Sequence, residues 1–294
     1  MATRPTLPYF APPDQLPAPL PTVAEILAST QFMKMVATAL PHPHVVRVGK
    51  HFLVKFGRHV RLQEGENMLF VKQAAGLAVP TVYALFHDEA TGQNFIVQEY
   101  IQGQGLDEYW QTATPDGKEA VVVQLRQYLD KLRSIPAPGY FGGVWRQSIL
   151  ETYATGGREA LQKGDVPACD TEEQWVETVI RNAEAGYPTK HPALLEFCKR
   201  MLHSVYRGHD PVFTHGDLHV SNIRLREDNT VVLIDWECAG WYPSHVEYCN
   251  ATVGLHFDTD WALWIPRFLN EYTHELAWMY QVRAWIFWGG NIEM

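Results

Sequence analysis

The chain contains 294 residues, of which 46% are hydrophobic and 19% are charged. This composition is typical of a folded globular protein and excludes a largely disordered chain. The length is enough for one large core or two moderate ones, because domains commonly contain about 100–200 residues. The formal net charge of −9 argues against a nucleic-acid partner, because phosphate backbones are bound by an excess of lysine and arginine.

The cysteines argue against a structural zinc site, because they form no CxxC pair and show no Cys/His ligand spacing. They lie at Cys169, Cys198, Cys238 and Cys249. Cys198 falls on an apolar helical stripe and is expected to be a buried free thiol. No secretory segment follows Met1, and no apolar run approaches the ~20 residues of a membrane span, so we expect a cytoplasmic protein with no membrane partner.

The first 21 residues hold seven of the 19 prolines, which predicts an extended arm lying loosely on the surface. Thr22 followed by Glu25 forms a capping-box pattern. This pattern predicts a helix that begins there and continues to Leu40.

The next part of the chain predicts a small antiparallel sheet. Val45–Gly57 reads as a hairpin with Gly49 and Lys50 at its turn, and Tyr83–Phe86 and Phe95–Val97 read as a second strand pair. A helix is expected between the two pairs, over 62–75. Lys55 ends an apolar strand, where a lysine must either reach solvent or meet an anion.

Two amphipathic helices are predicted in the second half of the chain. The first runs over 118–133 and places Val121, Leu125, Tyr128 and Leu132 on one stripe. The second carries the stripe Leu194, Cys198, Met201 and Val205. Between them, residues 145–170 have weak periodicity and predict irregular structure with short helices.

The segment Thr214–Glu237, THGDLHVSNIRLREDNTVVLIDWE, concentrates polar groups around short strands. Asp217 and Asn222 lie in a loop, and Asp235 follows the apolar run Val231–Ile234. An acid that can accept a hydroxyl proton, together with an amide and an acid that can bind magnesium, would suit phosphoryl transfer. His215 is expected to pack against the loop or hydrogen-bond to it.

HGDLHVSN followed by LIDWECAGWYP resembles the aminoglycoside phosphotransferase and choline kinase family of small-molecule kinases. This resemblance implies a two-lobed, protein-kinase-like α+β fold, with a small antiparallel sheet lobe and a larger, mainly helical lobe. We expect an N-terminal arm and helix over 1–44, a nucleotide-binding lobe over 45–101, and a lobe with the catalytic loop and acceptor pocket over 102–294. The resemblance also implies ATP, or alternatively GTP, with Mg²⁺ bound by Asn222 and Asp235, and Asp217 as the catalytic base.

The resemblance further implies that Lys55 binds the nucleotide phosphates. Glu66 is favoured over Glu64 as the ion-pair partner of Lys55, because its distance from Val79-Pro80 resembles the family pattern. The family likeness also makes the backbone of a short segment a candidate to contact adenine; its residues are Gln98, Glu99, Tyr100 and Ile101. No glycine-rich phosphate lid is evident, and Gly49, Lys50 and His51 at the first hairpin turn are the candidates for it.

The acceptor is expected to be a small molecule, because the chain has no room after Asp235 for a peptide-docking activation segment. The negative charge mildly favours a cationic acceptor. Aromatic residues between Phe257 and Trp288 could wall its pocket or simply pack helices together. Possible amine anchors are Asp258, Asp260, Glu271 and Glu275. Glu237 could lie near the metal or form a structural ion pair.

Three alternatives to this hypothesis remain. One is a choline- or sugar-directed kinase of primary metabolism. Another is a nucleotide-binding pseudokinase that acts as an interaction module. The third is an enzyme that uses the fold for other chemistry on a metabolite.

Overall fold

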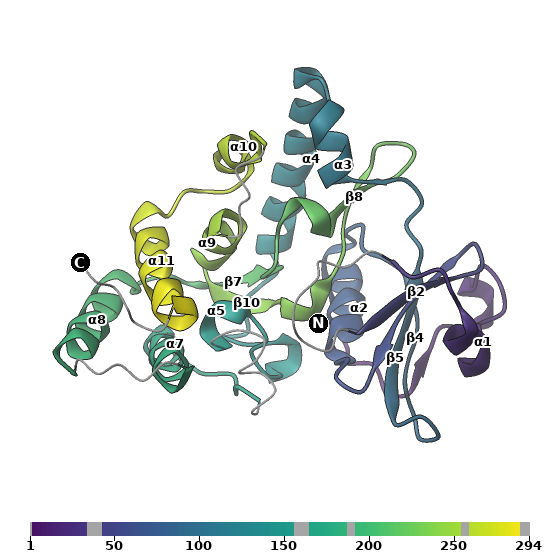
Figure 1. Cartoon of the computed structure of the whole chain (residues 1–294), viewed down its shortest axis with the longest axis horizontal. Coiled ribbons are helices and arrows are strands. Elements are labelled where there is room, and N and C mark those ends of the chain that lie inside the picture. Colours follow the sequence, from purple (N-terminus) through teal and green to yellow (C-terminus); the bar gives the residue numbers. More distant parts are fainter. Residues whose placement is uncertain (1, 34–42, 156–164, 187–191, 254–258, 289–294) are drawn as a thin grey trace. The chain divides into compact units, whose positions relative to one another are not determined.

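The computed structural model of the chain describes residues 2–33, 43–155, 165–186, 192–253 and 259–288 (Figure 1). The chain forms two compact units. The first comprises Met1–Gln104 with Arg224–Glu237, and the second comprises Gly105–Ile223 with Cys238–Met294. The chain therefore returns to the first unit for the short segment that ends in Asp235, Trp236 and Glu237.

A five-stranded antiparallel sheet forms the centre of the first unit, in the order β1-β4-β5-β3-β2. Its strands are β1 (Tyr9–Phe10), β2 (His44–Val48), β3 (Phe52–Gly57), β4 (Val82–Asp88) and β5 (Gln93–Glu99). Both predicted strand pairs are confirmed: Val46 lies opposite Val54, and Leu85 lies opposite Ile96. The predicted antiparallel sheet is therefore present.

Helix α2 (Gln63–Ala75) lies beside β4 and β5 in Figure 1, and it confirms the helix predicted over 62–75. The helix approaches the sheet closely at Gly65, because a Cβ atom there would collide with the side chain of Leu85. The helix ends at Gly76, whose φ of 60° is the left-handed conformation that glycine adopts readily at a helix C-terminus. The close approach at Gly65 fixes the position of the first turn of α2 over the sheet.

The N-terminal arm is part of the sheet, and the prediction of a loose surface arm is wrong. Strand β1 pairs with β4, placing Phe10 opposite Ala84, and Ala11 is buried. Proline-rich composition predicts an extended backbone, but whether an extended segment finds a strand to pair with depends on tertiary structure. A 3₁₀ turn, η1 (Pro13–Gln15), follows.

Helix α1 (Val23–Ala28) begins with the predicted capping box, in which Thr22 and Glu25 exchange hydrogen bonds. It buries Ile26 in a cluster with Phe52, Phe56 and Phe95. The helix ends at Ala28, so the predicted continuation is wrong up to Met33. Residues 34–40 of that prediction lie outside the described part of the chain.

The second unit is mainly helical. Its helices include α3 (Leu106–Thr112), α4 (Pro115–Arg133), η2 (Val144–Arg146), α5 (Thr152–Thr155), α7 (Glu172–Gly186), α8 (Pro192–Val205), η3 (Val220–Asn222), α9 (Val246–Val253), α10 (Trp261–Phe268) and α11 (Thr273–Trp288). The predicted apolar stripe of α4 is confirmed, since Val121, Leu125, Tyr128 and Leu132 are all buried. Cys198 of α8 is only half-buried, so the prediction of a buried thiol is wrong.

The remaining strands that the structure describes are five short segments. In the second unit, β7 (Pro211–Thr214) pairs antiparallel with β10 (Gly240–Pro243). A small sheet has the order β6 (Gln104–Gly105), β8 (Ile223–Leu225) and β9 (Val231–Leu233), and η4 (Trp236–Cys238) follows it. Strand β9 confirms the strand predicted before Asp235.

Among the described residues, no helix combines the length and the apolar character needed to cross a membrane.

Candidate functional site

Lys55 of β3 lies among three carboxylates of the first unit. Its Nζ is 2.6 Å from Glu64 Oε2, 3.0 Å from Asp235 Oδ1 and 3.1 Å from Glu237 Oε2. Lys55 and Glu64 are almost fully buried, whereas the side chains of Asp235 and Glu237 keep 28% and 27% of their exposure. The cluster therefore presents its two strand-end carboxylates toward solvent and holds its ammonium beneath them.

The formal charge of this cluster is negative, because three carboxylates surround one ammonium. Although burial alone would lower it, the pKa of Lys55 is raised well above its usual range by Asp235, Glu237 and Glu64. The pKa of Glu64 is raised to about 8, mainly by burial and also by Asp235 and Glu237, against the lowering effect of Lys55. Lys55 therefore remains charged, and the cluster has an excess of negative charge that a divalent cation could neutralise.

The structure corrects the predicted partner of Lys55, which is Glu64 and not Glu66. Glu66 Oε1 instead accepts a hydrogen bond from Arg4 Nε at 2.8 Å. Residues two apart on an α-helix point about 200° apart around its axis, so only one of the two can face β3. Family-like spacing to Val79-Pro80 does not determine this rotation, which is set by the packing of the helix on the sheet.

Asp235 is held at the end of β9 by its neighbours. Its φ of 60° lies in the left-handed region that non-glycine residues seldom adopt. The next residue, Trp236, is fully buried; its Nε1 donates to the carbonyl of Leu233, and its own carbonyl accepts from Asn67 Nδ2 of α2. These bonds fix the turn that carries Asp235 and Glu237 to the helix that carries Glu64.

The predicted adenine-contacting segment comprises the last two residues of β5 and the two residues after it, and part of its backbone is already hydrogen-bonded. The amide of Glu99 donates to Thr81 O, and the amide of Tyr100 donates to His51 O, both at 2.8 Å. Two of the four predicted contacts therefore lack a free amide proton in this conformation. Gln98 and Ile101 are buried. Of the weak lid candidates, Gly49 and Lys50 are exposed at the β2–β3 turn, and His51 provides the carbonyl bound by Tyr100.

In the second unit, the loop after β7 brings Asp217, Asn222 and His215 together. Asn222 Nδ2 donates to the Asp217 carbonyl at 2.8 Å and to its Oδ2 at 3.0 Å. The expected hydrogen bond of His215 is present, because the Asp217 amide donates to His215 Nδ1 at 3.3 Å. His219 also approaches Asp217, with Nε2 3.5 Å from Oδ2. The Asp217 carboxylate is thus oriented from its own loop and is 28% exposed.

Sequence reasoning missed two residues of α9 that hold this loop. Glu247 is fully buried and accepts hydrogen bonds from the amides of His215, at 2.6 Å, and Gly216, at 3.2 Å. Burial raises the pKa of Glu247, against the lowering effect of His215 and these bonds. Asn250 donates to the carbonyl of Gly216 at 3.0 Å. The available signal in the sequence was an acidic residue, Glu247, only two positions after the Pro243-Ser244-His245 turn.

Gly216→Ala is expected to destabilise the second unit and distort the loop that carries Asp217. Gly216 has φ of 84°, and an added Cβ would lie 2.5 Å from the carbonyl oxygen of Cys238. The backbone strain alone costs about 1–3 kcal/mol for a residue other than glycine, and the collision adds to it. Thermal denaturation should show a lower Tm than for the wild type.

Gly208→Ala is the matched control for this prediction. Gly208 has nearly the same φ, 82°, but an added Cβ would meet no atom within 4 Å. The stability of this control should fall only by the free energy that the left-handed backbone conformation costs an alanine. Equal losses of Tm in the two variants would show that the contact with Cys238 does not constrain the loop.

The predicted amine anchors are engaged elsewhere or lie outside the described residues. Asp260 accepts hydrogen bonds from Trp110 Nε1 at 2.9 Å, Trp264 Nε1 at 3.0 Å and Lys118 Nζ at 2.7 Å. The hydrogen bond of Lys118 is the main cause that lowers the pKa of Asp260 to about 2. Its carboxylate therefore serves to join α3, α4 and α10.

The other three predicted amine anchors each have different surroundings. Glu275 is 3.3 Å from His209 Nε2, Glu271 is exposed, and Asp258 lies outside the described residues. Among the aromatic residues, Trp261 and Phe268 are buried, and Trp261 packs edge to face on Trp110. These two residues pack helices together, as the alternative interpretation of the aromatic tail expects.

Residues 42–286 match the sequence model of the phosphotransferase enzyme family. No curated protein matches the chain in sequence. Among solved structures, the GDP and kanamycin complex of an APH(2″) aminoglycoside phosphotransferase matches with a TM-score of 0.53 at 15% identity, over 89% of this chain and 91% of that one.

Two further structures show the same fold. A complex of aminoglycoside phosphotransferase APH(4)-Ia with ADP and hygromycin B matches with a TM-score of 0.55 at 11% identity, over 90% and 87% of the two chains. Choline kinase LicA from Streptococcus pneumoniae matches with a TM-score of 0.50 at 13% identity, over 89% and 84%. At these identities, the matches establish the kinase-like fold that the sequence predicted.

Proposed function

We propose that this chain, which belongs to the phosphotransferase enzyme family, is a small-molecule kinase that transfers the γ-phosphoryl group of ATP to a hydroxyl of a small acceptor. The observation that carries the proposal is the set of competent groups in each unit. One contains a buried ammonium with strand-end carboxylates, and the other a partly exposed carboxylate held by an amide and an imidazole. The solved relatives that contain a nucleotide with kanamycin or hygromycin B support a nucleotide and a small hydroxylated acceptor.

The chemistry of the donor set fits Mg²⁺. This cation prefers oxygen ligands, among them one or two carboxylates. In the first unit Asp235 would hold it, and Glu237, whose carboxylate lies in the same cluster, is available beside it. Asn222 of the second unit stays a ligand predicted from the sequence. When bound, Mg²⁺ would neutralise charge on the phosphate oxygens.

The roles of the protein groups follow from the reaction. The acceptor oxygen forms a bond to the γ-phosphorus while the bond from that phosphorus to the leaving nucleotide oxygen breaks, and the hydroxyl proton passes to Asp217. Lys55 neutralises phosphate oxygens, and Glu64 holds its ammonium in place. Because Glu247 and Asn250 fix the backbone on which Asp217 lies, the base reaches the reaction with little freedom to reorient.

A screen of purified protein with Mg²⁺ and either ATP or GTP tests the proposal. The acceptors should include aminoglycosides, choline, sugars and hydroxylated natural products, with phosphorylated product detected by mass spectrometry. We expect one class to be phosphorylated and nucleotide with Mg²⁺ to raise the Tm. Neither nucleotide binding nor product formation with ATP or GTP would instead favour an inert interaction module.

The corrected ion pair gives a separate prediction. Glu64→Gln is expected to lower kcat/KM about 10-fold, because the Lys–Glu pair that aims the ammonium at the phosphates must be in place for transfer. The matched control is Glu66→Gln, the same substitution two residues further along the helix. It weakens the ion pair with the half-exposed Arg4 and should change kcat/KM less than about 2-fold. Steady-state kinetics test this prediction. A larger loss of kcat/KM in Glu66→Gln than in Glu64→Gln would mean that Glu66 is the functional partner of Lys55.

A further inference from the structure

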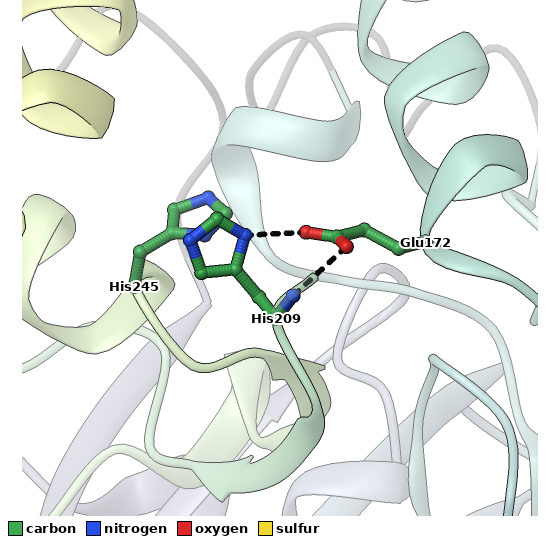
Figure 2. Close-up of side chains that lie close together, drawn as sticks. All are labelled: Glu172, His209 and His245. Atoms are coloured by element: carbon green, nitrogen blue, oxygen red, sulfur yellow. Dashed lines mark hydrogen bonds and ion pairs between the residues drawn. The ribbon is translucent and has the colours of Figure 1, made fainter. Parts of the chain in front are cut away.

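A cluster of two imidazoles and a carboxylate joins three segments of the second unit (Figure 2). Glu172 begins α7, His209 lies between α8 and β7, and His245 directly precedes α9. One donor atom from each of the three residues lies within 4.8 Å of the others. The two imidazole rings lie edge to face, with centroids 4.5 Å apart, and the Glu172 carboxylate faces His209.

His245 is a buried histidine with aromatic neighbours. Its relative exposure is 0%, and neither Nδ1 nor Nε2 has a hydrogen-bond partner among the described residues. Its ring stacks on Tyr206 with centroids 4.7 Å apart and meets the edge of Trp175. An apolar side chain would suit these packing contacts, so the buried ring nitrogens call for a ligand that none of the described residues supplies.

His209 has the arrangement of a metal-binding histidine. Its Nδ1 lies 2.6 Å from Glu172 Oε1, and its Nε2 lies 3.3 Å from Glu275 Oε1. Histidines that bind a metal through one nitrogen usually donate the other N–H to a carboxylate, which fixes the tautomer and the ring orientation. Glu275 is placed to accept that proton, so that Nδ1 is directed toward Glu172.

We propose that Glu172, His209 and His245 bind a divalent transition-metal cation, of which Zn²⁺ is the best fit. Two imidazole nitrogens and a carboxylate oxygen are a common zinc ligand set, with water in the fourth position. The cation takes the place of the proton between His209 Nδ1 and Glu172. The donors must then adopt separations of about 3.3 Å, as tetrahedral zinc requires.

The cation would stabilise the region that supports Asp217. The segment that contains His209 leads through β7 into the loop with His215 and Asp217. His245 is two residues before Glu247, whose carboxylate binds the amides of that loop. A cation bound to both segments and to α7 therefore ties the two supports of the loop together. This role does not depend on which reaction the protein catalyses.

Metal titration of the full-length protein tests the site. After chelator treatment and dialysis, Zn²⁺ should bind with one tight equivalent per chain and raise the Tm. Co²⁺ in its place should give visible ligand-field bands without a thiolate charge-transfer band, because no cysteine belongs to the cluster. Absence of tight binding, or a thiolate band, would overturn the proposal.

Substitutions then assign the ligands. His245→Phe and Glu172→Gln should each lower Zn²⁺ affinity at least about 100-fold, since even loss of an outer partner costs about 10–100-fold; Glu275→Gln should lose about 10-fold. The matched control is His203→Gln, because His203 Nε2 also lies 2.6 Å from a carboxylate, that of Glu177, but on the partly exposed side of α7 and α8. The control should bind Zn²⁺ as the wild type does.

His245→Phe also separates metal binding from folding. The metal-free variant should have at least the Tm of the metal-free wild type, because phenylalanine fills the same space without unpartnered buried nitrogens. Addition of Zn²⁺ should then raise the Tm of the wild type alone. Equal Zn²⁺ affinity in the wild type, His245→Phe and His203→Gln would mean that any bound zinc lies elsewhere.

Discussion

Replacing Asp217 with asparagine is expected to lower kcat by at least about 100-fold, because a positioned general base contributes about 10²–10⁴-fold to proton transfer. The amide has almost the same shape and can still accept the hydrogen bond from Asn222, but it cannot take up the acceptor proton. The dissociation constant of the nucleotide should stay unchanged, since Asp217 acts on the acceptor. Steady-state kinetics with the acceptor found by screening, together with nucleotide titration calorimetry, measure the two quantities.

The matched control for this loss is Asp116→Asn. Asp116 is an exposed residue in the first turn of α4 of the same unit. The same chemical change should leave kcat within about 2-fold there, because exposed substitutions away from special contacts have small effects. An Asp217→Asn variant with wild-type kcat would place the base on another residue.

Local patterns predicted most of the elements and the loop that places Asp217 beside Asn222. Strands β3, β4, β5 and β9 and helices α2 and α4 carry apolar residues at a strand or helix period, and this information lies within each segment. The same is true of Asp217 and Asn222, which are five residues apart in one loop and are hydrogen-bonded to each other. Where the residues of a site lie within one short stretch of chain, the sequence pattern is enough to predict that they lie close together.

The errors concern contacts between segments far apart in the chain. Glu64 and Glu66 have equal helical propensity, and only the packing of Gly65 on Leu85 shows which one the helix turns toward Lys55. The arm becomes strand β1 because β4 offers it an edge. Likewise, the residues of the Glu172, His209 and His245 cluster are separated by 37 and 36 positions, so no ligand spacing could reveal them. The spacing of the cysteines gives no information about a site made of histidine and glutamate side chains.

The second large effect is expected for Lys55→Met, which should lower kcat/KM at least about 100-fold. Removing one preorganised charged group at a site of developing charge typically costs about 10²–10³-fold. Methionine keeps the length and most of the volume of the buried lysine stem. The control is Lys72→Met on the exposed side of α2, which should leave kcat/KM unchanged. Kinetics at saturating and limiting nucleotide separate a loss of affinity from a loss of turnover.

The same variant has a consequence for stability, because it leaves the buried Glu64 facing Asp235 and Glu237 without their cation. Loss of one partner of a buried ion pair costs about 3–5 kcal/mol when the other remains charged. The pKa of Glu64 is already raised to about 8, and removal of Lys55 raises it further. The folded protein then binds more protons than the unfolded chain above the ordinary glutamate pKa, so the free energy of unfolding must fall as the pH rises through this window.

Urea denaturation between pH 7 and pH 9, a window that spans the raised pKa of about 8, should therefore show a loss of stability that continues to higher pH in Lys55→Met than in the wild type. The double variant Lys55→Met, Glu64→Gln should lose most of this pH dependence, because it removes the titrating group itself. Parallel pH profiles in all three proteins would mean that Glu64 and Lys55 are not coupled in the folded state. In that case, the loss of activity in Lys55→Met would come from the phosphate contact alone, and the aiming role of Glu64 would have to be abandoned.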